Sequence, residues 1–165
     1  MQPWAGGDRP EDRLRFEGFP HCVGCGEEHP HGLHLRFFRD AESIVGWPRL
    51  AQDWQGGPGI VHGGIVSLLL DEYSCAASWF LRGRIAVTGS LNVRFEAPCP
   101  VDRELFARAW VTAEDHPAYR EIAAAVWCDG ALVARSTGRF FPARPSASRL
   151  DGGRRRRGSS RGTPP

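Results

Sequence analysis

The chain has 165 residues, of which 41% are hydrophobic, and a formal net charge of +2. This length and composition are typical of one globular domain with enough residues to close a core. The sequence has no apolar run long enough to cross a membrane and no secretory signal at its N-terminus, so we expect a cytoplasmic protein. It contains no lysine, which excludes Schiff-base chemistry by a lysine side chain.

Positive charge is concentrated at the C-terminal end. Residues 144–165 hold seven arginines and one aspartate among Gly, Ser and Pro. Such a segment has too few apolar residues to fold, so we expect a disordered tail over residues 143–165. An arginine-rich tail can contact nucleic acid, but no helix-turn-helix pattern accompanies it. We therefore prefer to interpret it as an unselected extension and do not expect a nucleic-acid partner.

The first third of the chain is rich in turns. Residues 1–20 contain many Gly, Pro and charged residues, which indicates a loose or partly helical lead-in. Short alternation predicts a first strand over residues 33–38 and a second over 42–50, interrupted near Pro48. A glycine-rich loop at 55–59 then leads to the main helix.

One long helix is predicted from residue 61 to residue 80. Apolar residues fall on nearly every side of it, the pattern of a buried helix. Asp71 and Glu72 interrupt this pattern. Burying a carboxylate costs several kcal/mol unless it has a partner or a task, so Asp71 is a candidate catalytic residue. The alternatives are that Asp71 is a paired structural acid, or that Glu72 carries the chemistry.

Four strands are predicted after the helix. Residues 84–96 alternate, and the apolar residues of one expected face are Ile85, Val87, Leu91, Val93 and Phe95. Further strands are predicted over 105–112, 119–128 and 131–141, with a hairpin turn at Asp129-Gly130. Strands joined by short turns pair antiparallel, and a helix that is apolar all round must be covered. The sequence therefore predicts an α+β fold with one central helix wrapped by an antiparallel sheet.

Two motifs carry a resemblance to a known family. Gly59-Ile-Val-His-Gly-Gly64 is followed by Asp71, and later by Thr88-Gly-Ser-Leu-Asn-Val-Arg-Phe-Glu-Ala-Pro98. Together they closely resemble the hotdog-fold acyl-CoA thioesterases related to the phenylacetate-pathway thioesterase. The segment Cys22-x-x-Cys-Gly-x-x-His-Pro-x-Gly-Leu33 resembles the N-terminal signature of one branch, except that this branch usually has Asn at the position of His29.

The resemblance implies a hotdog domain over residues 21–142, with a five- or six-stranded sheet around the helix. It implies dimers or dimers of dimers. For the site it implies Asp71 as general base or nucleophile, the Gly63 N–H as the group that polarises the thioester carbonyl, and Thr88 as a hydroxyl that helps to place water. His62 is either a general acid, a group that orients the thioester, or a cap of the helix. The expected substrate contacts are Gln55, Val61, Gly64 and Arg94.

Helix geometry adds a constraint on assembly. If the helix begins near Gly63, Asp71 lies eight residues further on, about 12 Å along the axis at 1.5 Å per residue. One carbonyl cannot contact both groups. We therefore infer that Gly63 of one subunit faces Asp71 of another across a two-fold interface, so that the active protein is a homo-oligomer.

The cysteines permit a second interpretation. Cys22 and Cys25 have the spacing of zinc ligands, and four histidines lie nearby in the sequence (His21, His29, His31 and His34). Because the pattern is compact and the ligand set ambiguous, we prefer a turn with partly buried thiols and predict neither a metal site nor a cofactor. Cys75 is expected to be a core residue rather than a nucleophile.

These observations favour an acyl-CoA thioesterase that hydrolyses its substrate to a free acid and CoA by carboxylate-assisted attack of water. Two alternatives stay open. The same fold serves enoyl-CoA hydratases and dehydratases, which use a histidine with an acid, and it could serve a non-enzymatic acyl-CoA sensor. The sequence does not indicate which acyl group is cleaved or whether the oligomer is a dimer or a tetramer.

Overall fold

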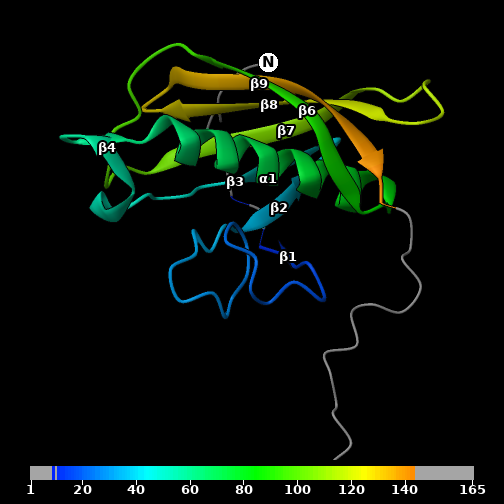
Figure 1. Cartoon of the computed structure of the whole chain (residues 1–165), viewed down its shortest axis with the longest axis horizontal. Helices are drawn as coiled ribbons and strands as arrows, with labels where there is room; N and C mark the ends of the chain where they lie inside the picture. The colour runs from blue at the N-terminus through cyan, green and yellow to red at the C-terminus, as the bar shows by residue number, and fades with distance from the viewer. Residues whose placement is uncertain (1–8, 10, 144–165) are drawn as a thin grey trace, which may run out of the picture.

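The structure, a computed structural model, describes residues 9 and 11–143. Within this part of the chain, helix α1 (Gly63–Arg82) packs across a seven-stranded antiparallel sheet (Figure 1). Across the sheet the strands follow the order β1 (Arg13–Leu14), β2 (Phe37–Asp40), β3 (Ser43–Gly46), β7 (Leu105–Ala113), β8 (Arg120–Cys128), β9 (Ala131–Pro142) and β6 (Ala86–Phe95). The predicted fold, one long helix against an antiparallel sheet, is confirmed.

The six predicted strands are present, and several of them begin or end at other residues than expected. β2 starts at Phe37 rather than at residue 33, because the backbone N–H groups of Leu33 and Leu35 donate to Val23 and Gly24 of the preceding turn. The predicted loop at 55–59 contains a short hairpin of β4 (Gln55–Gly57) and β5 (Ile60–Val61), preceded by the 3-10 turn η1 (Gln52–Trp54).

The lead-in, which was expected to be loose or partly helical, contributes the two-residue strand β1. In residues 11–20 the structure has β1 and no helix. The remaining predictions for the lead-in, and the prediction of a disordered tail over 144–165, concern residues outside the described part of the chain.

Helix α1 begins and ends two residues later than predicted. His62 caps its start, and Gly83 ends it in the left-handed region at φ 67°, where its N–H donates to Trp79 O. Glycine adopts this conformation without the steric cost that a Cβ would bring. Nowhere in residues 9 and 11–143 does a helix combine the length and the hydropathy needed to cross a membrane.

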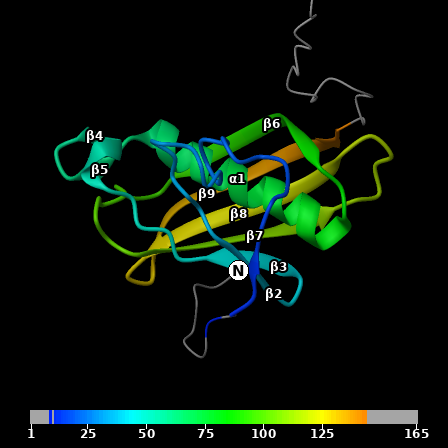
Figure 2. The same ribbon diagram turned by 90° about the horizontal axis from the view of Figure 1, so that it is seen from below.

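The helix is covered on two sides, which explains its apolar character all round. One side packs on the sheet and contains the residues Leu69, Leu70, Tyr73, Ala76 and Ala77, each at most 1% exposed. The lead-in crosses the other side (Figure 2). There the ring of Phe16 lies 5.8 Å from that of Trp79 and 4.9 Å from that of Phe80, centroid to centroid.

Strand β6 differs from its predicted alternation. Leu91 and Val93 pack against the core as expected, but Val87 is 61% exposed and Phe95 is 52% exposed. The pairing register with β9 shifts between Thr88 and Ser90. Such a bulge reverses the faces of the residues before it relative to those after it, so Val87 lies on the opposite face of the strand from Leu91, Val93 and Phe95. Within the described residues β6 pairs only with β9, and its other edge is open.

Candidate functional site

The first group of predicted site residues lies at the start of α1. His62 Nδ1 accepts a hydrogen bond from Gly64 N–H at 2.9 Å, and the backbone N–H of His62 donates to Trp54 O at 2.8 Å. Of the sequence-based roles for His62, the structure shows the cap. In the part of the chain described, no group accepts a hydrogen bond from Gly63 N–H. The free donor at the helix start is therefore Gly63 N–H, and the helix dipole favours negative charge there.

The second group lies two turns further along α1. Thr88, on β6, donates its hydroxyl to Asp71 Oδ1 at 2.7 Å. Burial raises the pKa of Asp71, and the hydrogen bond from Thr88 opposes this rise. Of the two Asp71 oxygens, this bond uses one and leaves Oδ2 for a water molecule.

Cys75 lies beside this pair, with its Sγ 3.8 Å from Thr88 Oγ1. Burial raises the pKa of the Cys75 thiol to about 12. A thiol with such a pKa stays protonated at neutral pH and is a poor nucleophile.

The structure does not bring the two groups together within one chain. Gly63 and Asp71 are eight residues apart on the same helix, and the helical rise places them about 12 Å apart along the axis. His62, Gly63 and Gly64 share the helix start, whereas Asp71 and Thr88 lie where the middle of α1 meets the edge strand.

The predicted substrate contacts occupy different places. Gln55 accepts a hydrogen bond from Gly59 N–H at 3.3 Å and lies on the hairpin before α1. Gly64 follows on the helix itself, with its N–H already bonded to His62. Val61 is only 3% exposed and its N–H donates to Cys99 O, so it belongs to the core. Arg94 lies on β6 with a side chain 68% exposed and forms an ion pair with Glu96 at 3.1 Å.

The structure contains a third cluster of polar side chains, which the sequence analysis did not predict. Glu72 points toward Cys22 and Cys25, in the turn that follows the lead-in, and the ligand atoms of these three residues all lie within 4.8 Å of one another. In the described residues no histidine joins the cluster, although sequence spacing suggested one. The available signal was the position of Glu72: successive helix residues are about 100° apart, so the side chains of Asp71 and Glu72 leave the helix in different directions.

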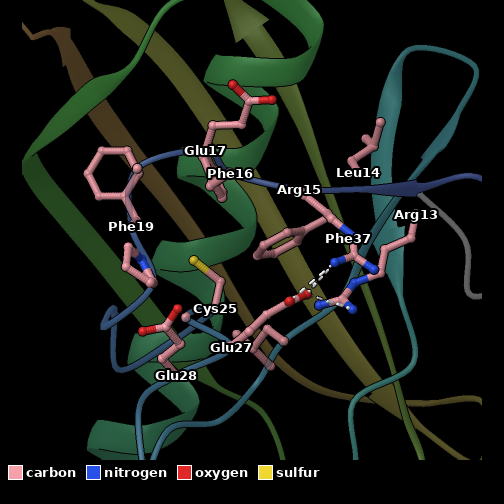
Figure 3. Close-up of a pocket in the computed structure, with 14 residues that line it drawn as sticks. Arg13, Leu14, Arg15, Phe16, Glu17, Phe19, Cys25, Glu27, Glu28 and Phe37 are labelled. Carbon is pink, nitrogen blue, oxygen red and sulfur yellow. Dashed lines mark hydrogen bonds and ion pairs between the residues drawn. The ribbon is translucent and has the colours of Figure 1, made fainter.

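A pocket under the lead-in holds none of the predicted catalytic residues. It is lined by Phe16, Phe19, Cys25 and Phe37 among others, and the carboxylate of Glu27 points toward two arginines (Figure 3). One carboxylate oxygen of Glu27 lies 3.0 Å from Arg13 and 2.9 Å from Arg15. The pocket does not include Asp71 or Thr88. The ion pairs of Glu27 with Arg13 and Arg15 hold the lead-in in place, and we do not assign hydrolysis to this pocket.

Residues 58–114 match the family model described as the thioesterase superfamily. The matched segment contains His62, Gly63, Gly64, Asp71 and Thr88. No curated protein sequence matches this chain.

Solved structures share the fold. A thioesterase superfamily protein aligns with a TM-score of 0.68 at 26% identity, over 74% of this chain and 63% of its own. This chain therefore spans less than two thirds of that protein. A phenylacetic acid degradation-related protein of Ralstonia eutropha JMP134 gives 0.59 at 21% identity, over 66% and 85% of the two chains.

A third structure, a hypothetical thioesterase of Streptococcus pneumoniae TIGR4 solved with coenzyme A, gives a TM-score of 0.58 at 19% identity, over 63% and 82% of the two chains. Below 25% identity such a likeness shows a shared fold. The shared fold and the match of residues 58–114 to the superfamily model together confirm the resemblance predicted from the two central motifs. This chain has the fold of the thioesterase superfamily and carries its sequence pattern around α1.

Proposed function

We propose that this protein is an acyl-CoA thioesterase that hydrolyses its substrate to a free acid and CoA. The observation that carries the proposal is the half-buried Asp71, held by the Thr88 hydroxyl at 2.7 Å inside the segment that matches the thioesterase superfamily. The S. pneumoniae protein of the same fold was solved with coenzyme A, which supports a CoA thioester as the substrate class.

The proposed chemistry needs one base and one oxyanion donor. Asp71 Oδ2 accepts a proton from water while the water oxygen forms a bond to the thioester carbon. The carbonyl electrons move onto its oxygen, where the Gly63 N–H stabilises the negative charge. The tetrahedral intermediate then collapses, the C–S bond breaks, and the CoA sulfur takes the proton from Asp71. One oxyanion donor of this kind typically contributes about 3 to 4 kcal/mol in the transition state.

Because Gly63 and Asp71 of one chain are too far apart, the proposal includes a second subunit. The open edge of β6 supports this part, since a ten-residue strand with an unpaired edge can pair with another copy. Apolar side chains exposed near that edge are Ile85, Val87, Phe95 and Phe141, at 37–61% exposure. Contact with a second copy would bury them.

Strand register indicates what such a pairing would bring together. A two-fold axis through the middle of β6, between Ser90 and Leu91, would set Thr88 opposite Val93 of the partner subunit. Two residues beyond Val93 is Phe95, and a Cβ placed on Gly63 would lie 3.4 Å from its ring. The Asp71–Thr88 pair of one subunit would therefore approach the start of α1 in the other.

The experiment is release of free thiol from short, long and aromatic acyl-CoA substrates, with wild type beside Asp71→Asn. We expect release from at least one substrate and a turnover at least about a hundredfold lower in the variant, the usual scale for a positioned base. Asp115→Asn makes the same change on the exposed turn between β7 and β8 and should retain wild-type turnover.

Two results would overturn the proposal. Near wild-type turnover in Asp71→Asn would remove this carboxylate from the mechanism. Consumption of an enoyl-CoA without release of thiol, by a folded protein that cleaves no thioester, would instead favour the hydratase class.

A further inference from the structure

We propose that Cys22, Cys25 and Glu72 bind one zinc ion, which fastens the turn at residues 22–26 to the central helix. The two sulfurs and a carboxylate oxygen all lie within 4.8 Å of one another, and Cys22 Sγ is 3.4 Å from Glu72 Oε1. This site is separate from the proposed hydrolytic pair, and its existence does not depend on the proposed function.

The distances suit a tetrahedral zinc ion. Zinc binds thiolate sulfur at about 2.3 Å and carboxylate oxygen at about 2.0 to 2.2 Å, so a sulfur and an oxygen that share a tetrahedral ion lie about 3.5 Å apart. The observed 3.4 Å between Cys22 and Glu72 agrees with this edge. Two thiolates with one carboxylate form a ligand set that favours zinc over magnesium or calcium, which prefer oxygen alone.

The electrostatics of Glu72 leave a place for a cation. Its carboxylate is half-buried on α1, and its partners are the thiols of Cys22 and Cys25, which are weak donors. In the part of the chain described, the charge that acts on Glu72 is that of Asp71, which is repulsive, and no arginine or histidine offsets it. A buried carboxylate is normally paired or coordinates a metal. A divalent ion would supply the missing positive charge.

The turn that carries the cysteines is built to approach the helix closely. Gly26 N–H donates to Cys22 O at 2.9 Å, which folds the segment back on itself, and Leu33 N–H donates to Val23 O at 2.8 Å. A Cβ on the buried Gly24 would lie 2.3 Å from Glu72 Cδ. A residue with a Cβ at position 24 would therefore displace the Glu72 side chain from the place where it meets both sulfurs. Figure 3 shows Cys25 on this turn, next to the rings of the lead-in.

The fourth coordination position is open to a small pocket. The three ligands border a space of about 190 Å³ whose other lining residues are Phe16, Phe19, Cys75, Ile85 and Ala86. Cys75 faces this pocket but lies outside the compact group of three. The fourth ligand is then a water molecule, and the two thiol protons leave to solvent when the ion binds.

The test uses protein purified without a polyhistidine tag. Bound metal is measured by elemental analysis after zinc is loaded and excess is removed, and the cobalt-loaded wild type is examined for a thiolate-to-cobalt absorption band. We expect one zinc per chain and a thiolate band. Cys22→Ser, Cys25→Ser and Glu72→Gln should each weaken zinc binding by more than about a hundredfold. Removal of a residue that only hydrogen-bonds to a metal ligand costs at most about that much.

Two matched thiol variants complete the design. Cys128→Ser, on β8, and Cys75→Ser, in the same pocket, should each retain one zinc per chain. The proposal is overturned if loaded wild type contains essentially no zinc and gives no thiolate band. It is also overturned if Cys75→Ser loses zinc as completely as Cys22→Ser, or if thiol titration of fresh protein finds Cys22 and Cys25 joined in a disulfide. The wild-type measurements need no variant to fold.

Discussion

Two adjacent carboxylates on α1, Asp71 and Glu72, have different surroundings. Burial raises the pKa of both side chains. Asp71 accepts a hydrogen bond from the Thr88 hydroxyl and faces the open edge strand, whereas Glu72 meets the thiols of Cys22 and Cys25. A step of about 100° around the helix separates two chemical environments. In our proposals one carboxylate moves protons and the other binds a metal.

The largest expected effect separates these two roles. Asp71→Asn should lower turnover by at least about a hundredfold while the protein keeps one zinc per chain. Glu72→Gln should lose zinc. Thiol release and metal content measured on the same preparations check both statements, and loss of zinc in Asp71→Asn would show that the two carboxylates do not act separately.

A charge on the open edge of β6 tests whether Asp71 works with a second subunit. Val87→Glu places a carboxylate on a side chain that is 61% exposed, so the free energy of unfolding of the monomer should change little. Burial of this charge in the proposed interface should raise the dimer dissociation constant by about thirtyfold, equivalent to roughly 2 kcal/mol. Light scattering after size exclusion measures it, with Val87→Thr as the control. A dimer unaffected by Val87→Glu would place the interface elsewhere.

The Thr88 hydroxyl tests the immediate partner of Asp71. Thr88→Val removes the hydrogen bond to Oδ1 but keeps the shape of the side chain. A hydrogen bond to a charged group contributes about 1.5 to 3 kcal/mol, so turnover should fall by about tenfold or more. Thr88→Ser restores the hydroxyl and should restore most of the activity. Equal turnover in the two variants would mean that this bond does not serve catalysis.

The smallest effect is expected at Tyr73, the residue that follows Asp71 and Glu72 on α1. Its role is structural, so it serves as a reference for those two carboxylates. Its hydroxyl donates to Arg36 O at 3.0 Å, and its ring is buried between α1 and the sheet. Tyr73→Phe should lower the free energy of unfolding by about 1 kcal/mol and the melting temperature by a few degrees. Denaturant unfolding measures the change. A much larger loss of folding free energy would contradict this value, and a loss of zinc would show that the cluster around Glu72 depends on this bond.

The order of elements could be predicted from the sequence because each depends on local pattern. Between residue 61 and residue 80 apolar residues fall on nearly every side of a helix, which required a covered helix, and short turns such as Asp129-Gly130 required antiparallel neighbours. α1 and the six strands followed from these signals. The positions of Asp71 and Thr88 could be related only through the family resemblance, and the structure shows their hydrogen bond directly.

What could not be predicted depends on contacts between distant segments. The bulge near Gly89 reverses the face of β6, and nothing in the alternation of residues 84–96 reveals a pairing partner such as β9. Glu72 meets Cys25 and also Cys22, which lies 50 residues earlier in the chain, because the turn after the lead-in lies against α1. Spacing in the sequence instead suggested nearby histidines as metal ligands, because it reveals only residues that are close along the chain.

The most direct test of a shared site is complementation between two inactive variants. Gly63→Pro removes the N–H donor at the first helical position, where proline is well tolerated, and His62, at φ −59° and ψ 135°, already lies in the polyproline II region that suits a residue before proline. Asp71→Asn removes the base. Co-expressed with different tags, the two should form mixed dimers in which one of the two sites combines an intact Asp71 with an intact Gly63 of the partner subunit. With random pairing half of the dimers are mixed, and each mixed dimer has one intact site of two. The whole preparation should therefore release thiol at about a quarter of the wild-type rate. No recovery in purified mixed dimers, with each variant folded and inactive alone, would contradict a site built from two subunits.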